Sequence, residues 1–130
     1  MTLRRAALAL ALATTGGVAH ATDWKPAGRT FGGNEVYVDA AAMRRAGDVR
    51  TTWVRVVYAR PVDVPGGEAR SFEALAHFDC RAGSSAGIAV ILYADEAGSR
   101  VLLHTQEESV RFNRDPEGSF GALASETICR

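Results

Sequence analysis

The sequence predicts an α+β fold: an antiparallel β-sheet with one C-terminal helix tethered to one face by a disulfide. Glycine and proline recur at short intervals between runs rich in β-branched and aromatic residues, which is typical of an antiparallel meander and not of βαβ units. Near the C-terminus the spacing of apolar residues changes to that of a helix. Two cysteines, Cys80 and Cys129, stand where a strand and this helix would end.

Two segments, residues 49–58 and 71–80, carry the clearest strand pattern. In the first, both alternating rows hold large apolar residues, which favours a central strand covered on both faces. In the second, Phe72 and Phe78 share a face with Cys80. Shorter strands are expected at residues 35–39 and around 27–31, and a hairpin at residues 88–94 and 100–105, joined across 95–98.

The C-terminal helix is expected to follow Ser119 as its N-cap. Apolar or half-polar side chains then recur at helical spacing over about ten residues: Phe120, Leu123, Ala124, Thr127 and Ile128. A helix this short is marginal alone in water, so it needs a surface. A bond from Cys129 to Cys80 requires their Cα atoms to lie within about 7 Å, which places the helix on the phenylalanine face.

The opposite face of the sheet has no element to cover it. It is expected to carry Leu75 and His77, together with either Trp53 and Val57 or Val54 and Val56, because the pattern leaves the register open. An uncovered apolar sheet face usually marks a dimer interface or a binding surface, so a homodimer through this face is one expectation. The alternative is that its polar members and an N-terminal segment screen it.

Residues 1–21 have the layout of a secretory signal peptide. Arg4 and Arg5 precede a short apolar run at residues 6–13, and Ala19-His20-Ala21 matches an A-x-A cleavage site. An ordinary amphipathic helix does not fit, because the apolar run has no polar face. We expect cleavage after Ala21, which leaves residues 22–130 as a single domain.

Export bears on location and on partners. No cysteine stands directly after the apolar run as a site for lipid attachment, and no later segment approaches the length of a membrane helix. We therefore expect an exported protein, periplasmic or secreted or at the cell surface, that is not lipid-anchored. Removal of residues 1–21 takes away two arginines and no acid, leaving a net charge of about −2, which argues against a nucleic-acid partner.

The two cysteines are expected to pair, because an exported protein meets an oxidising compartment and the count is even. The bond Cys80–Cys129 would close a loop that stabilises the domain by roughly 4 kcal/mol in the chain-entropy model. Two free thiols or a two-cysteine metal site are the alternatives. The metal site lacks support, because such a site needs further histidine or cysteine ligands at short spacing and Cys129 has none nearby.

No catalytic site, cofactor site or metal site is predicted. Beyond residue 21 only His77 and His104 could serve in a nucleophilic triad, and no G-x-S-x-G elbow occurs. His77 and Asp79 alternate on one strand face, and His104 could join them across the sheet to hold a metal or haem. These residues follow no spacing motif, so a solvated surface is the favoured interpretation.

The order of several short motifs resembles the surface-adhesin protein E family. They run through nearly all of the sequence after the predicted cleavage site: Trp24, Tyr37-Val38-Asp39, Trp53, Asp79-Cys80, Tyr93, Gly118-Ser119 and Ile128-Cys129. The resemblance implies a sheet of about six strands with a disulfide-tethered C-terminal helix. It also implies a surface lipoprotein that binds host matrix and plasma proteins such as vitronectin, laminin and plasminogen, with links to dimer formation and haem.

The sequence departs from that family at one point, since no cysteine marks a lipid anchor. Three hypotheses follow. The leading one is an exported, non-enzymatic binding protein that adheres to host matrix or plasma proteins. The second is a soluble periplasmic accessory module that binds other bacterial envelope proteins. The third and least favoured is an enzyme or haem carrier that uses His77 and His104.

Overall fold

The computed structural model describes residues 22–130. The predicted signal peptide, residues 1–21, and its cleavage after Ala21 lie outside the described residues. The described part holds eight strands and one helix: β1 (Trp24–Arg29), β2 (Glu35–Asp39), β3 (Arg44–Ala46), β4 (Val49–Val64), β5 (Gly67–Asp79), β6 (Ser84–Tyr93), β7 (Val101–Gln106), β8 (Asn113–Arg114) and α1 (Phe120–Ile128).

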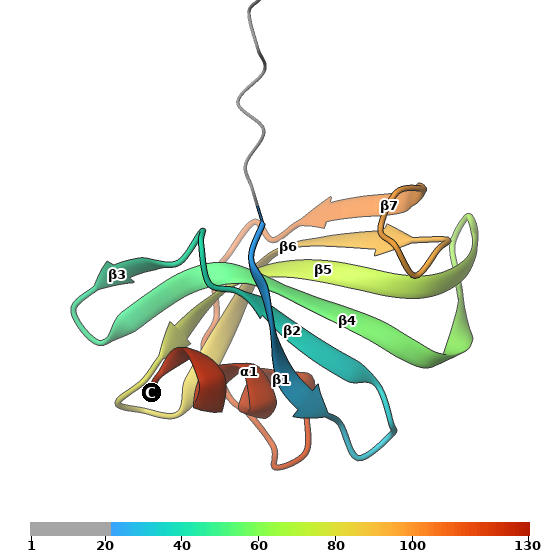
Figure 1. Ribbon diagram of the computed structural model, residues 1–130. Coiled ribbons are helices and arrows are strands. Elements are labelled where there is room, and N and C mark those ends of the chain that lie inside the picture. Colours follow the sequence, from blue (N-terminus) through green and yellow to red (C-terminus); the bar gives the residue numbers. More distant parts are fainter. Residues whose placement is uncertain (1–21) are drawn as a thin grey trace, which may run out of the picture.

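The strands form one antiparallel sheet, as predicted. Six of them follow the order β1-β2-β4-β5-β6-β7, while the short strands β3 and β8 pair with β4 and β6 (Figure 1). The six-strand path agrees with the expected sheet size. The short strands escaped prediction because Arg44–Ala46 and Asn113–Arg114 carry no alternating apolar pattern, and they pair through backbone groups alone.

The hairpin of β4 and β5 is longer than predicted. The turn at Pro65–Gly66 closes it, and Gly66 and Gly67 adopt positive φ angles of 96° and 143° that other residues rarely tolerate. The pairing register shifts between Val57 and Val62, around Pro61, which has no N–H to donate to the ladder. The hairpin therefore bends here, and its tip lies against Leu102 of β7.

The first strand lies three residues earlier than expected, at Trp24–Arg29. The chain turns at Thr30, whose carbonyl oxygen accepts from Gly33 N (2.9 Å) and whose Oγ1 accepts from Asn34 N (3.0 Å). Phe31 stands in this turn and is 81% exposed, so the predicted strand around 27–31 is wrong at its C-terminal end. The turn returns the chain into β2 at Glu35.

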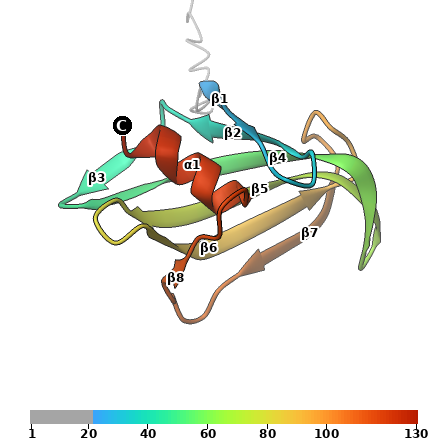
Figure 2. The same ribbon diagram turned by 90° about the horizontal axis from the view of Figure 1, so that it is seen from below.

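The helix packs on the phenylalanine face, as predicted (Figure 2). The register question is also settled: Val54 and Val56 are fully buried on this face, and Trp53 and Val57 point to the other. One core joins the helix to the three strands β2, β4 and β5: Val36, Val38, Val54, Val56, Phe72, Ala74, Ala76, Phe78, Ala124 and Ile128. The one helix in residues 22–130 is not long and apolar enough to cross a membrane.

Both ends of the helix are fixed. Ser119 is the N-cap, and its Oγ accepts from Ala122 N at 3.3 Å. The disulfide Cys80–Cys129, with 5.5 Å between Cα atoms, holds the other end to the strand. Phe120 packs edge-on against Phe72 with ring centroids 5.2 Å apart, yet it stays 37% exposed and is less buried than its place in the predicted apolar face suggests.

Candidate binding surface

The face of the sheet away from the helix is called here the open face. On β4 it carries Trp53, Arg55 and Val57, all half-buried, whereas the alternate residues of the same strand are buried. The expectation that this strand would be covered on both faces is therefore wrong. Within residues 22–130 no helix lies on the open face, and only loop segments reach over its margins. Large apolar side chains remain partly accessible as a result.

A depression of about 650 Å³ lies on the open face, between the start of β1 and the loop at residues 40–43. Trp24, Met43 and Arg44 line it, and Trp53 and Leu75 contribute from the central strands. We call this depression the tryptophan hollow. It brings residues that are 51 positions apart in sequence, from Trp24 to Leu75, into one concave surface.

Asp39 holds the two sides of the tryptophan hollow in place. Its Oδ1 accepts hydrogen bonds from Asp23 N (3.3 Å) on one side and from Ala41 N (3.0 Å) and Ala42 N (3.2 Å) on the other. Its carbonyl oxygen accepts from Thr52 Oγ1 at 2.7 Å. Asp39 is only 2% exposed, and a buried carboxylate needs such donors. The hollow is thus a preformed part of the fold.

A second, shallower depression of about 460 Å³ adjoins the first, because Trp24 lines both. Its other walls include Tyr37, Arg55 and Val57. Tyr37 donates its phenolic hydrogen to Glu35 Oε2 at 3.0 Å, and this hydrogen bond raises the pKa of Tyr37 above its usual value. The two depressions together form a groove along the open face with Trp24 between them.

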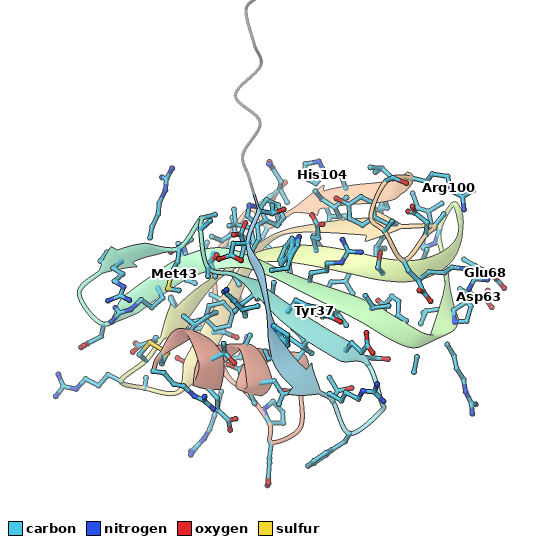
Figure 3. All side chains as sticks on the ribbon, viewed as in Figure 1. Tyr37, Met43, Asp63, Glu68, Arg100 and His104 are labelled. Carbon is cyan, nitrogen blue, oxygen red and sulfur yellow. A yellow bond between two sulfur atoms is a disulfide. The ribbon has the colours of Figure 1, made fainter. Side chains whose placement is uncertain are left out.

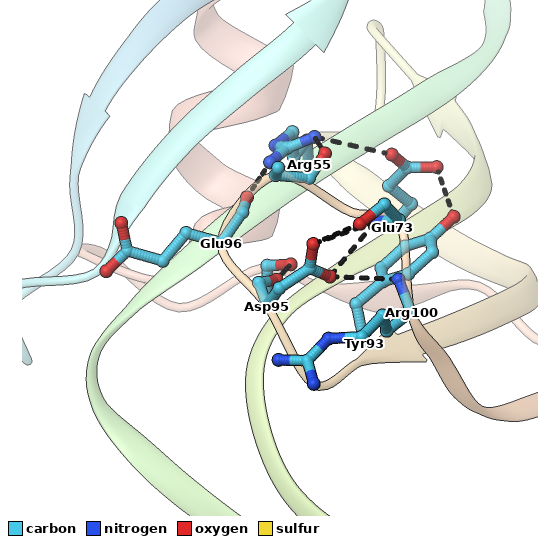
Figure 4. A network of polar contacts seen from close by, with 9 residues as sticks. Arg55, Glu73, Tyr93, Asp95, Glu96 and Arg100 are labelled. Carbon is cyan, nitrogen blue, oxygen red and sulfur yellow. Dashed lines mark hydrogen bonds and ion pairs between the residues drawn. The ribbon is translucent and has the colours of Figure 1, made fainter.

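Arg55 and Glu73 form a cross-strand ion pair in the middle of the open face, with Nη1 and Oε1 3.7 Å apart and both side chains less than 20% exposed. Arg55 also donates to the carbonyl oxygens of Ala97 (3.0 Å) and Glu96 (Figure 4). It therefore ties the loop between β6 and β7 to the sheet. Buried charges are stable in such a place only because each is paired and hydrogen-bonded.

Tyr93 completes this network by donating to Glu73 Oε2 at 3.0 Å. Burial, with the nearby carboxylate of Glu73, raises the pKa of Tyr93 to about 12. In the loop itself, hydrogen bonds from Ser99 and from the backbone N–H of Arg100 lower the pKa of Asp95 to about 2. The polar groups at the centre of the open face are thus satisfied within the face.

The structure does not bring the two histidines together. His77 lies on β5, where its Nδ1 is 2.6 Å from Thr51 Oγ1 and its ring stacks on Phe112 with centroids 6.2 Å apart. Asp79 accepts from Arg81 N and Ala82 N in the turn that follows. His104 is exposed on β7, the outer strand at the other edge of the sheet (Figure 3). In the described part of the chain, no three His, Cys, Asp or Glu side chains are grouped to hold a metal.

Sequence reasoning placed Leu75 on this face and offered Trp53 with Val57 as one of two options, and all three line the groove, whereas His77 lines neither depression and the other residues of the groove were missed. Trp24 was informative only as part of the family resemblance, because the start of β1 was not predicted. Met43 belongs to a loop whose position depends on the contacts of Asp39. The one available signal for this loop was Asp39, an acidic residue at the end of a run of strand residues.

Two comparisons with known proteins extend the geometry. Residues 24–130 match the family model described as Surface-adhesin protein E. The solved structure of Haemophilus influenzae protein E, in its crystal form II, is similar in fold: the TM-score is 0.50 at 14% identity, over 72% of this chain and 79% of that one. No curated protein matches the sequence. The family match covers almost all of the described residues, and the chain belongs to the surface-adhesin protein E family.

Proposed function

We propose that this protein is an exported, non-enzymatic binding protein that holds a protein partner on its open face. The observation that carries the proposal is the groove formed by the two adjoining depressions around Trp24. Aromatic side chains and arginine in a concave, partly apolar setting are the residue types that dominate protein interfaces. Membership of a family of surface adhesins supports the same conclusion.

The proposed partner is a host matrix or plasma protein, as the family resemblance implies. The proposed route to that partner is export: residues 1–21 act as the signal peptide, cleavage follows Ala21, and residues 22–130 form the single binding domain. A homodimer through the open face would compete with such a partner for the same groove. Sedimentation of the purified domain over a range of concentrations measures whether that homodimer forms.

Location is tested by protease treatment of intact cells and of osmotically shocked cells. Cleavage on intact cells is expected for a surface adhesin. Protection until the outer membrane is opened would instead favour a periplasmic accessory protein that binds other envelope proteins. An immunoblot of these samples also reports the mass of the protein. It therefore shows whether residues 1–21, with a mass of about 2 kDa, have been removed.

Binding is tested with purified residues 22–130 on immobilised vitronectin, laminin and plasminogen. Trp24→Ala is expected to weaken binding by about tenfold or more, as truncation of a central aromatic anchor usually does. Lys25→Ala is the matched control, because Lys25 is exposed and belongs to the alternate row of the same strand. Equal affinities of the two variants, or no saturable binding to any of the three proteins, would contradict the proposal.

A further inference from the structure

We infer that the tryptophan hollow accepts an aromatic side chain of the partner that lies next to a carboxylate. The inference rests on the proposed function and narrows it to the chemistry of one anchor. Three observations carry it: the size and lining of the hollow, the absence of aromatic ring contacts to its two half-buried indoles within residues 22–130, and the balance of its charges.

The size of the hollow fits a side chain and not a whole folded segment. At about 650 Å³ it falls within the range of small-ligand sites, roughly 300–1,000 Å³. Its lining is mainly apolar, with Trp24, Trp53, Met43 and Leu75 all half-buried. Such a pocket gains most from the burial of a flat apolar group, because the transferred area is large and few polar atoms are desolvated.

Neither tryptophan of the hollow is paired with another aromatic ring in the described part of the chain. Within residues 22–130, the ring contacts join Tyr58 with Phe72, Phe72 with Phe120, and His77 with Phe112, and neither indole takes part in one. Stacked or edge-on aromatic pairs contribute about 0.5–1.5 kcal/mol beyond their buried area. An incoming aromatic ring can form such contacts here without breaking any that exist in the described structure.

The charges in the hollow select an anion and not a cation. Asp39 is buried and already accepts three backbone N–H groups. Glu73 forms an ion pair with Arg55 and accepts a hydrogen bond from Tyr93. Arg44 is exposed, and among residues 22–130 it forms no ion pair. The uncommitted charge of the lining is therefore positive, which favours a neighbouring carboxylate.

Thr22 would add a second positive charge to the hollow after the predicted removal of the signal peptide. It lies in the lining of the hollow, so cleavage after Ala21 would place a new α-ammonium group there. The mature protein would then present two cations near one apolar pocket. The inference predicts stronger capture of aromatic anions by mature residues 22–130 than by the uncleaved chain.

The probes are a matched pair with the same ring and opposite charge: 2-naphthylacetate and 2-(2-naphthyl)ethylamine. The chain has two tryptophans and both line the hollow, so both indole N–H signals of an NMR spectrum respond to a ligand there; Trp53 does not line the second depression, so its signal distinguishes the two. 2-Naphthylacetate is expected to shift both signals with a Kd of about 1 mM, as befits a ligand of this size. The amine is expected to bind at least about threefold more weakly.

Arg44→Glu should weaken binding of 2-naphthylacetate by about fivefold and improve binding of the amine. Arg45→Glu is the matched control, since Arg45 is exposed on the same strand but belongs to the alternate row, opposite Arg50. Trp53→Leu, which keeps an apolar residue in the sheet, should weaken both probes. Equal response to the two probes, equal effects of the two arginine variants, or no shift of either indole signal would overturn the inference.

The remaining outcomes separate this inference from the proposed function. If 2-naphthylacetate binds as expected but no matrix or plasma protein does, the hollow is a small-molecule site and the proposed partner is wrong. If Trp24→Ala weakens a protein partner while Arg44→Glu and the probes have no effect, the function stands and the anchor chemistry fails. If the indole signals shift with protein concentration alone, the occupant is a second copy of this chain, which also overturns the inference.

Discussion

The two faces of the same sheet are built on different principles, and β4 shows the contrast along one strand. Val54 and Val56 are completely buried against the helix-covered face, while Trp53 and Arg55, one residue away, remain half-buried on the open face. The covered face is filled by valines and alanines together with Phe72 and Phe78, which are buried beneath the helix. The open face keeps its large aromatic residues accessible around a hollow.

The difference between the two faces indicates that the covered face stabilises the fold and that the open face is available for binding. The core of the covered face is buried and its helix is tethered by a disulfide, so most of the free energy of folding should come from there. The polar side chains of the open face, Arg55 and Glu73 above all, satisfy one another and a neighbouring loop. The open face is therefore rigid before any partner arrives, which lowers the entropic cost of binding.

The largest expected effect comes from removing the disulfide that closes the covered face. Replacing Cys80 and Cys129 by alanine should lower the free energy of unfolding by about 4 kcal/mol, the loop-closure value for a separation of 49 residues. The nine-residue helix would then lose its tether, and alone it is marginal in water. Urea unfolding of both proteins without reductant measures the change. An unchanged midpoint would show that the helix is held by packing alone.

The second comparison truncates one side chain on each face of β5. Phe78→Ala should cost about 3 kcal/mol, because Phe78 is 1% exposed and leaves a cavity beneath the helix. Leu75→Ala on the open face should cost about half as much, since Leu75 is half-buried and already partly hydrated. Denaturant melts of the two variants give the ratio. Equal losses would mean that both faces contribute alike to the core.

Much of the covered face could be predicted from the sequence because local rules decide it. Ser119 precedes a helical apolar period, and Phe72 and Phe78 alternate with Cys80 on a strand, so the two cysteines specify which surfaces meet. Register along β4 could not be predicted, since both of its rows are apolar. The choice depends on the neighbours β2 and β5, which place Val38 and Ala74 beside Val54.

The open face was harder to predict because its shape depends on contacts distant in sequence. The tryptophan hollow exists only where Asp39 joins the start of β1 to the loop that holds Met43. The tie between Arg55 and residues 96 and 97 likewise spans about 40 positions. No periodicity in the sequence encodes such contacts, whereas an alternating strand or a capped helix can be recognised from residues that are close together in the sequence.

The third prediction concerns the polar centre of the open face at alkaline pH. The pKa of Tyr93 is raised to about 12 from 10.0, so between these values the folded state keeps a proton that the unfolded chain has lost. Unfolding then releases a proton, and the free energy of unfolding should fall by about 2 kcal/mol as the pH rises from 10 toward 12. This contribution is fully present below pH 10.

Tyr93→Phe removes the titrating group, so its stability should decline less steeply over that range. Rapid urea unfolding at pH 9 and at pH 11.5 gives the slope, which is independent of any constant loss from the missing hydrogen bond to Glu73. Tyr37→Phe, whose hydroxyl is bonded to Glu35 on the same face, is the control and should change the slope less. Parallel slopes for the wild type and Tyr93→Phe would contradict the assignment.

The smallest expected effect tests how closely the helix fits the covered face. Gly121 is buried in the first turn of α1, and a Cβ there would lie 2.2 Å from Oδ1 of Asp115. Asp115 is held by Ser85, whose Oγ donates to Oδ1 at 2.7 Å, and its Oδ2 is buried without a partner within residues 22–130. Alanine normally stabilises a helix interior by about 1 kcal/mol over glycine, but here the clash opposes that gain.

Gly121→Ala alone should therefore lower the free energy of unfolding by about 1 kcal/mol, despite its better helix propensity. In an Asp115→Ala background the same substitution has room and should raise stability by about 1 kcal/mol relative to Asp115→Ala itself. A double-mutant cycle by urea unfolding gives the coupling, which should be about 2 kcal/mol. Additive effects would show that Asp115 moves aside freely, in which case the glycine is not needed to seat the helix and the fit at this end of the covered face is loose.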